Sequence, residues 1–252
     1  MDIFPVYILS KDRVQNKTAE LMKNCGVPHK LFVEPQEVDA YSEQHGAENI
    51  VNIKQNDRGL VYVRNFILDY ATERGDDWFW MLDDDIGSFF SREGTRTKKC
   101  DADEALLGAQ YILGPGKDAH VGQLALEYQQ FAWSAKKDYR TNSYADCVVA
   151  LNTKKLKRSR IRYDEDLQLK VDRDLTIQII VSGLDVVRVT RFLFSTPKNG
   201  SNAGGLQSVY QSGVEKNNSL ALAKKWPAFC APFTKRDGRQ DVKISWNKIR
   251  TE

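Results

Sequence analysis

Short apolar runs alternate with amphipathic segments through the first third of the chain. Residues 6–9 (VYIL), 31–33 (LFV) and 50–53 (IVNI) are rich in β-branched and aromatic residues, which predicts strands. Apolar residues recur at helical spacing over residues 14–25 and again over 60–70. The pattern therefore predicts strands that are separated by helices.

A continuously apolar strand is predicted over residues 78–82 (WFWML), directly before three aspartates at 83–85. Strands separated by helices of this length are typical of βαβ units, and an apolar run without alternation fits a strand buried on both faces. The predicted fold class is α/β, with a Rossmann-like, mainly parallel central sheet flanked by helices and a loop-rich C-terminal portion.

The remainder of the chain is less regular. A polar stretch over residues 91–100 (SREGTRTKKC) predicts a loop, and the tail from Thr196 onward is rich in glycine, asparagine and serine. Helices are predicted over residues 105–113, 121–132 and 172–182, and strands over 147–151 and 186–194. Because no internal repeat or long linker divides the chain, we expect a single domain over residues 1–252.

Composition narrows the class of protein. The 252 residues include 37 Lys plus Arg against 34 Asp plus Glu, a net charge of +3, which excludes a uniformly basic protein but not a locally basic face. Four widely spaced cysteines form no C-x-x-C pair, so free thiols in a reducing cytosol are expected. No signal peptide is evident, and no apolar stretch approaches the roughly 20 residues of a membrane span. We therefore expect a cytoplasmic, intracellular protein without a membrane partner.

The three aspartates are the sharpest chemical feature. Ligands of α/β sheets collect at the carboxyl ends of parallel strands, and Asp83 and Asp85 can point to the same side there if the backbone stays extended. Paired carboxylates suit Mn²⁺ or Mg²⁺, which bridges to the phosphates of a nucleotide. The alternative is a solvated acidic loop, which the apolar strand before it disfavours.

The order of several motifs resembles that of a known class of enzymes. Ser10 and Arg13 after the first strand, Arg64-Asn65 on the helix before the acidic strand, and the D-x-D at Asp83–Asp85 resemble nucleotide-sugar glycosyltransferases of the GT-A fold. Downstream, RYDEDLQLKVDRDLTIQIIVSGL is similar to the acidic element and helix that close such a site. More narrowly, residues 3–205 resemble the TET-associated glycosyltransferases. That family adds sugars to hydroxymethylated pyrimidines in DNA, in kinetoplastids and bacteriophages, which implies a chain that can be phage-encoded.

The resemblance implies a role for individual residues. A nucleoside-diphosphate sugar, with a UDP-sugar as the first choice, would be bound together with Mn²⁺ or Mg²⁺. Asp172 matches the position of the catalytic base of inverting enzymes, Asp174 is its rival, and helix N-capping is the alternative role for Asp172. The remaining assignments are Ser10, Arg13 and Glu34 around the nucleoside, Arg64 near the phosphates or the acids, Asp83 and Asp84 at the donor, and Asp85 with Asp83 as metal ligands.

One departure from the family pattern concerns a later metal ligand. Many GT-A enzymes supply a histidine from a C-terminal segment, whereas the histidines here are His29, His45 and His120. Residues 195–205 are the expected substitute, since glycines allow close approach of the backbone to phosphate. Within it, the donor-binding candidates are Lys198, Asn199, Gly204 and Gly205, with Asn202 as another source of an oxygen ligand. The alternative is a surface loop.

A basic run over residues 154–162 (KKLKRSRIR) holds six cations and no acid. Such a run is either a solvated face or, beside a sugar-transfer site, a surface that contacts DNA phosphates. Trp226 and Trp246 lie among further cations, so they can stack on a base or pack in the core. A target base in duplex DNA would have to be flipped out. The DNA-binding candidates are Lys154, Lys155, Lys157, Arg158, Arg160 and Arg162.

These observations predict a metal-dependent, inverting glycosyltransferase that acts on the hydroxymethyl group of 5-hydroxymethylcytosine or 5-hydroxymethyluracil in DNA. Residues 1–90 would bind the nucleotide sugar, 91–205 would hold the acceptor and catalytic residues, and 206–252 would form a basic extension. Three alternatives stay open: a glycosyltransferase with a saccharide, lipid or protein acceptor; a nucleotidyltransferase, although SKDRVQNK lacks the usual glycines; and a non-catalytic DNA-binding module.

Overall fold

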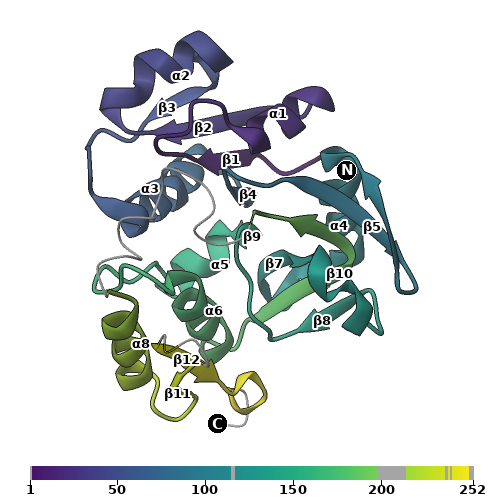
Figure 1. The fold of residues 1–252 in the computed structure, drawn as a ribbon, viewed down its shortest axis with the longest axis vertical. Helices are drawn as coiled ribbons and strands as arrows, with labels where there is room; N and C mark the ends of the chain where they lie inside the picture. Colours follow the sequence, from purple (N-terminus) through teal and green to yellow (C-terminus); the bar gives the residue numbers. More distant parts are fainter. Residues whose placement is uncertain (1, 115–116, 198–213, 236–237, 239, 250–252) are drawn as a thin grey trace.

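The computed structural model describes residues 2–114, 117–197, 214–235, 238 and 240–249 of the chain. Within them, ten strands form one sheet with the path order β3-β2-β1-β4-β9-β7-β10-β5-β6, and β8 pairs with β10 (Figure 1). The strands are β1 (Val6–Leu9), β2 (His29–Val33), β3 (Ile50–Asn52), β4 (Trp78–Asp83), β5 (Ser88–Glu93), β6 (Arg96–Cys100), β7 (Val121–Tyr128), β8 (Tyr139–Thr141), β9 (Val148–Asn152) and β10 (Asp185–Ser195).

Strand direction decides which residues meet at each edge of the sheet. β1, β2, β3 and β4 are parallel, β9 is antiparallel to both β4 and β7, and β10 is parallel to β7. The strands β1–β4, β7 and β10 therefore all end at the same edge. The predicted α/β class with a mostly parallel central sheet is confirmed, with β9 inserted in the opposite direction.

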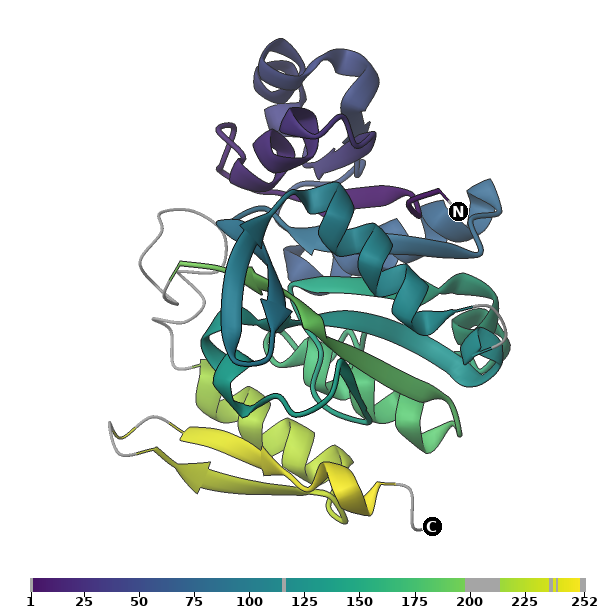
Figure 2. The same ribbon diagram turned by 90° about the vertical axis from the view of Figure 1, so that its right-hand side faces the viewer.

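Helices cover both faces of the sheet (Figures 1 and 2). Alternation along β1 explains the two layers, because Val6 and Ile8 pack in one apolar cluster with α1 and α4, whereas Tyr7 packs in the other with α3 and α6. The helices are α1 (Lys17–Asn24), α2 (Val38–His45), α3 (Gly59–Arg74), α4 (Ala102–Leu113), α5 (Thr153–Arg158), α6 (Val171–Val181) and α8 (Val214–Lys225). The 3₁₀ turns are η1 (Pro35–Glu37), η2 (Ala47–Asn49), η3 (Lys117–His120), η4 (Gln129–Ser134) and η5 (Trp246–Lys248).

The loop-rich C-terminal portion contains regular structure in its described part. Residues 214–225 form α8, and β11 (Cys230–Thr234) and β12 (Gln240–Ile244) form an antiparallel hairpin against it. Asp241 of this hairpin lies 2.8 Å from each of the cationic groups of Lys170, Arg173 and Lys235. This ionic cluster fixes the hairpin to the start of α6.

Two sequence predictions are wrong. Residues 121–132 form the strand β7 and the 3₁₀ turn η4, not one helix, because β7 lies between β9 and β10 and is buried on both faces. Residues 91–100 lie mostly in the β5–β6 hairpin, not in a loop. The polar side chains gave no strand pattern, because β5 pairs with β10 through backbone hydrogen bonds. Gly94 lies in the left-handed region at the turn of the hairpin (φ +61°).

No helix in the described residues is long and apolar enough to cross a membrane.

Candidate active site at the carboxyl edge of the sheet

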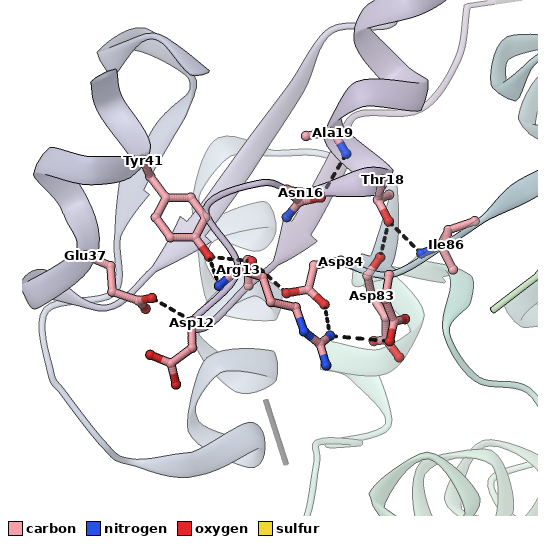
Figure 3. Close-up of polar contacts among 12 residues, drawn as sticks. Asp12, Arg13, Asn16, Thr18, Ala19, Glu37, Tyr41, Asp83, Asp84 and Ile86 are labelled. Carbon is pink, nitrogen blue, oxygen red and sulfur yellow. Dashed lines mark hydrogen bonds and ion pairs between the residues drawn. The ribbon is translucent and has the colours of Figure 1, made fainter. Parts of the chain in front are cut away.

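The three aspartates lie at the edge where β1 and β4 end. Leu9 and Asp83 are opposite each other in these parallel strands, so the chain beyond β1 meets the chain beyond β4. Figure 3 shows the resulting arrangement, in which Arg13 reaches from the loop after β1 toward the acids. Ser10 and Arg13, which we expect around the nucleoside, therefore lie beside the three aspartates. We call residues 83–85 the acidic turn.

The start of α1 holds the backbone of the acidic turn. The hydroxyl of Thr18 donates to the carbonyl of Asp83 (2.7 Å) and accepts from the amide of Ile86 (3.0 Å), as Figure 3 shows. Asn16 caps the helix by accepting from the amide of Ala19 at 2.9 Å. Because Thr18 is fully buried, these hydrogen bonds are shielded from water and fix the direction in which the three carboxylates leave the strand.

Asp84 points toward β1. The hydroxyl of Ser10 donates to one Asp84 oxygen (2.7 Å), and Arg13 donates to the other (2.5 Å) and lies 3.3 Å from Asp85. The hydroxyl groups of Tyr41 and Ser10 are 2.7 Å apart, and Tyr41 also accepts from the amide of Arg13. Burial raises the pKa of Asp84, while Ser10 and Arg13 act in the opposite direction. Asp84 therefore anchors the loop that carries Arg13.

Arg64 connects the acidic turn to the second half of the site. Its guanidinium, on α3, pairs with Asp83 at 3.1 Å and with Asp172 on α6, and it lies 5.4 Å from the ring centroid of Tyr163. Arg64 is 4% exposed, and its Nε has no hydrogen-bond partner within the described residues. Burial raises the pKa of Asp83 to about 6, although Arg64 opposes this shift. One buried cation thus serves two carboxylates.

Asp172 and Asp174 point to different surroundings. Asp172 lies in the first turn of α6 with its side chain 16% exposed, and it does not cap the helix, whose N-cap is Lys170. Asp174 is fully buried and binds Trp226 (2.7 Å) and Lys225 (2.9 Å) of the α8 end. Its oxygens are therefore engaged in joining α6 to α8, which leaves Asp172 as the candidate base.

Glu34 lies at the end of β2 and is 2% exposed. Lys11 contacts both of its carboxylate oxygens at 2.9 Å, and the Gln36 side chain and the Asp57 amide donate to it at 2.9 and 3.0 Å. The predicted nucleoside contact would therefore have to compete with partners from the same chain.

The acids at this edge fit a divalent cation with few protein ligands. Within the described residues, no group of three His, Cys, Asp or Glu side chains is arranged to hold a metal ion. Mg²⁺ bound to nucleotides usually takes one or two carboxylates together with phosphate oxygens and waters. Asp83 and Asp85, with side chains 28% and 26% exposed, match that donor set. The candidates Lys198, Asn199, Asn202, Gly204 and Gly205 lie outside the described residues.

The basic run lies at the opposite edge of the sheet. β9 is antiparallel to β4 and brings Asn152 opposite Trp78, so α5 follows at the start of β4. At about 3.3 Å per residue, β4 separates the two edges by roughly 17 Å. Lys154 pairs with Asp77 (2.7 Å) and Arg162 with Asp69 (2.5 Å), while Lys157, Arg158 and Arg160 are exposed. DNA binding by this run stays a prediction. It would take place at the edge of the sheet opposite the acidic turn.

Several residues of the site were not predicted from the sequence. Thr18 and Tyr41 hold the acidic turn and the Arg13 loop, and Cys147 accepts the amide of Asp83 at its carbonyl (2.9 Å). Only Thr18 left a signal, since Asn16 before it marks a helix start. Of the two tryptophans that the sequence offers for stacking or core packing, Trp226 binds Asp174. Trp246 stacks on Tyr144 (centroids 6.3 Å apart) beside a cavity of about 310 Å³.

Solved structures share this architecture. Residues 1–349 of S. aureus TarS match at 12% sequence identity and a TM-score of 0.50, over 88% of this chain and 66% of that chain. The same TarS fragment in complex with UDP-GlcNAc matches at 13% identity and a TM-score of 0.51, over 88% and 67%. This chain thus spans about two thirds of the TarS fragment. The fold is that of the GT-A nucleotide-sugar glycosyltransferases.

A family model classifies the chain more narrowly than the fold does. The family model of the TET-associated glycosyltransferases matches residues 4–205, and the chain belongs to this family. The resemblance predicted over residues 3–205 is confirmed. No curated protein sequence matches the chain.

Proposed function

We propose that this protein transfers a sugar from a nucleoside-diphosphate sugar to the hydroxymethyl group of 5-hydroxymethylcytosine or 5-hydroxymethyluracil in DNA. The observation that carries the proposal is the bridge made by Arg64 between Asp83 and Asp172, inside a segment that matches the TET-associated glycosyltransferase family. The bridge joins acids suited to a diphosphate-bound cation to a carboxylate suited to accept a proton.

The donor would lie across the ends of β1, β2 and β4. Ser10, Arg13 and Glu34 would surround the nucleoside, and the TarS fragment in complex with UDP-GlcNAc supports a UDP-sugar as the first donor to test. Mn²⁺ or Mg²⁺ held by Asp85 and Asp83 would supply positive charge for the leaving diphosphate. Residues 1–90 would thus form the nucleotide-sugar half, residues 91–205 the acceptor and catalytic half, and residues 206–252 an extension.

Asp172 would act as the base on the acceptor. The O–H bond of the hydroxymethyl group breaks as its proton passes to the Asp172 carboxylate, and the oxygen bonds to the anomeric carbon of the sugar. The bond between that carbon and the phosphate oxygen breaks, and its electron pair leaves with the nucleoside diphosphate. A single displacement of this kind inverts the configuration at the anomeric carbon. Arg64 would orient Asp172 for this step.

Mass spectrometry of nucleosides tests the proposal. DNA containing 5-hydroxymethylcytosine or 5-hydroxymethyluracil is incubated with the protein, Mn²⁺ and a mixture of nucleotide sugars, then digested. We expect the mass of one added hexose or pentose on the modified base. Asp85→Asn should yield no product, whereas Asp77→Asn, at the opposite end of β4 and 57% exposed, should act like the wild type.

Two results would contradict the proposal. Modified bases that keep their mass, while the protein binds UDP-sugars in calorimetry, rule out this acceptor. Undiminished transfer by Asp85→Asn rules out the acidic turn as the metal and donor site.

A further inference from the structure

The segment after β7 carries strongly exposed aromatic side chains. Trp133 is 74% exposed and Phe131 is 44% exposed, and both belong to η4. A single exposed apolar residue is ordinary. Two aromatic rings two residues apart on a six-residue turn, beside a candidate active site, present exposed surface on which a flat ring can stack.

Exposed cations lie on the segments next to these rings. Lys136 and Lys137 follow η4 and are exposed, and β6 lies beside it, since the Gln129 side chain donates to the Thr97 hydroxyl at 3.3 Å. In the described part of this region, the acids Asp138 and Glu127 pair with Arg92 and Arg140, and the exposed Glu93 lies opposite Arg96 in the β5–β6 hairpin. Because side chains alternate along a strand, Lys99 shares the face of β6 on which Thr97 meets η4. We call the following residues the η4 face: Lys99, Phe131, Trp133, Lys136 and Lys137.

The η4 face is continuous with the candidate active site. β7 and β4 end at the same edge, and η4 follows β7 directly. The hydroxyl of Tyr128, the last residue of β7, lies 3.1 Å from the sulfur of Cys147, whose carbonyl accepts the Asp83 amide. The Tyr128 ring meets Phe131 edge to face, with centroids 6.2 Å apart. A chain of contacts therefore leads from the acidic turn to the exposed rings.

We propose that the η4 face binds an unpaired strand of nucleic acid and guides the acceptor base to the site. Bases would stack on Trp133 and Phe131, while phosphates would contact Lys136, Lys137 and Lys99 of β6. Rings interleaved with cations are the arrangement by which proteins hold single strands without reading their sequence. The inference rests on the proposed function and adds where the acceptor lies.

An unpaired strand suits the η4 face better than a closed duplex. Stacking on a protein ring needs a base whose flat face is free, and a paired base within a duplex has none to offer. A target base must also leave the duplex stack for its hydroxymethyl group to reach Asp172. Trp133 would hold a neighbouring base after that opening, so substrates that are already single-stranded should bind more tightly than duplexes.

Fluorescence anisotropy with a labelled single-stranded oligonucleotide, without donor or metal, tests the inference. Trp133→Ala should weaken binding about tenfold. Lys136→Ser with Lys137→Ser should weaken binding and lower the slope of log affinity against log salt by about 1.4, which is 0.7 for each lost phosphate contact. All of these side chains are exposed, so folding should survive, which circular dichroism checks.

The competing surface is tested by Lys154→Ser with Lys157→Ser, which removes two exposed cations of the basic run at the opposite edge. We expect this variant to weaken binding less than Trp133→Ala does. If it weakens binding while Trp133→Ala does not, the inference is overturned in favour of the basic run. Binding of heparin but not of the oligonucleotide overturns it in favour of a polyanionic saccharide.

The same variants separate this inference from the proposed function. If the oligonucleotide binds through Trp133 but no sugar reaches hydroxymethylated DNA, the η4 face stands and the proposed transfer fails. If sugar is transferred to DNA equally well by the wild type and by Trp133→Ala at limiting DNA concentration, the transfer stands and the η4 face is overturned.

Discussion

Arg64 on α3 and Asp172 on α6 form an ion pair across the candidate active site, although they belong to helices far apart in the sequence. The guanidinium is almost fully buried and also reaches Asp83, so it is the one described cation that touches both the acidic turn and the candidate base. Its planar group with several donors suits two carboxylates at once, which a lysine ammonium does not.

Arg64→Lys should therefore impair catalysis more than donor binding. A displaced Asp172 carboxylate is expected to lower kcat about a hundredfold, with a smaller change in KM for the donor. Arg64→Ala should also lower the free energy of unfolding by about 3–5 kcal/mol, because it leaves two carboxylates without their cation. Steady-state kinetics and urea titration measure both effects. Arg162→Lys, in a half-exposed pair with Asp69, is the control and should stay within about 1 kcal/mol.

Thr18→Val should loosen the acidic turn while preserving the shape of the side chain. The amide of Ile86 loses its acceptor in a buried position, which should cost about 1–3 kcal/mol in stability. Affinity for a nucleoside-diphosphate sugar, measured by calorimetry, should fall with it. Thr72→Val provides the comparison, because its hydroxyl donates only to Leu68 in its own helix (2.7 Å). Unchanged donor affinity in Thr18→Val would mean that the turn does not need this clamp.

The ionic cluster of Asp241 should make stability depend on pH. Burial acts to raise the pKa of this carboxyl, but hydrogen bonds from Lys170 and Lys235 hold it well below its usual range. The cluster therefore stabilises the folded protein above pH about 4, and this contribution is lost as the pH falls further. Asp241→Asn should cost about 3–5 kcal/mol at pH 7, a difference that shrinks toward pH 3. A constant difference across this range would contradict the role of the charge.

Gly108 should resist substitution for reasons of packing. A Cβ built there would lie 2.3 Å from the ring of Phe192, which belongs to β10. Gly108→Ala gains about 1 kcal/mol of helix propensity, yet overpacking of the ring should outweigh this and lower stability by about 1–3 kcal/mol. Thermal melts of both variants measure this difference. Gly94→Asn, at the open turn of the β5–β6 hairpin, should be nearly neutral in stability.

The sequence was informative where local pattern and tertiary environment agree. The apolar strand before Asp83 and the helical spacing of residues 60–70 both follow from burial, which is visible in one dimension. β7 was misread because a strand buried on both faces loses its alternation, and Leu124, Tyr128 and Phe131 then match helical spacing by coincidence. The β5–β6 hairpin was missed because its pairing with β10 is set by backbone groups.

The residues of the candidate site were also predictable only where local sequence marks them. The acidic turn, Ser10, Arg13 and Arg64 follow from motif order, since each sits where a predicted element ends or faces the acids. The distance of residues 154–162 from the acidic turn could not be read from the sequence, because it depends on the direction of β9. Likewise, nothing local marks Asp174 as the partner of Trp226.

That direction of β9 has a practical consequence. The strand begins beside Asp83 and is followed by α5. Its length therefore separates the edge that carries the acidic turn from the opposite edge, where the surface residues of α5 lie. A biotin attached to a cysteine introduced as Ser159→Cys would anchor the protein with its acidic turn and η4 face toward the solution. Single-molecule and surface-based assays could then observe substrate arrival without blocking the entrance.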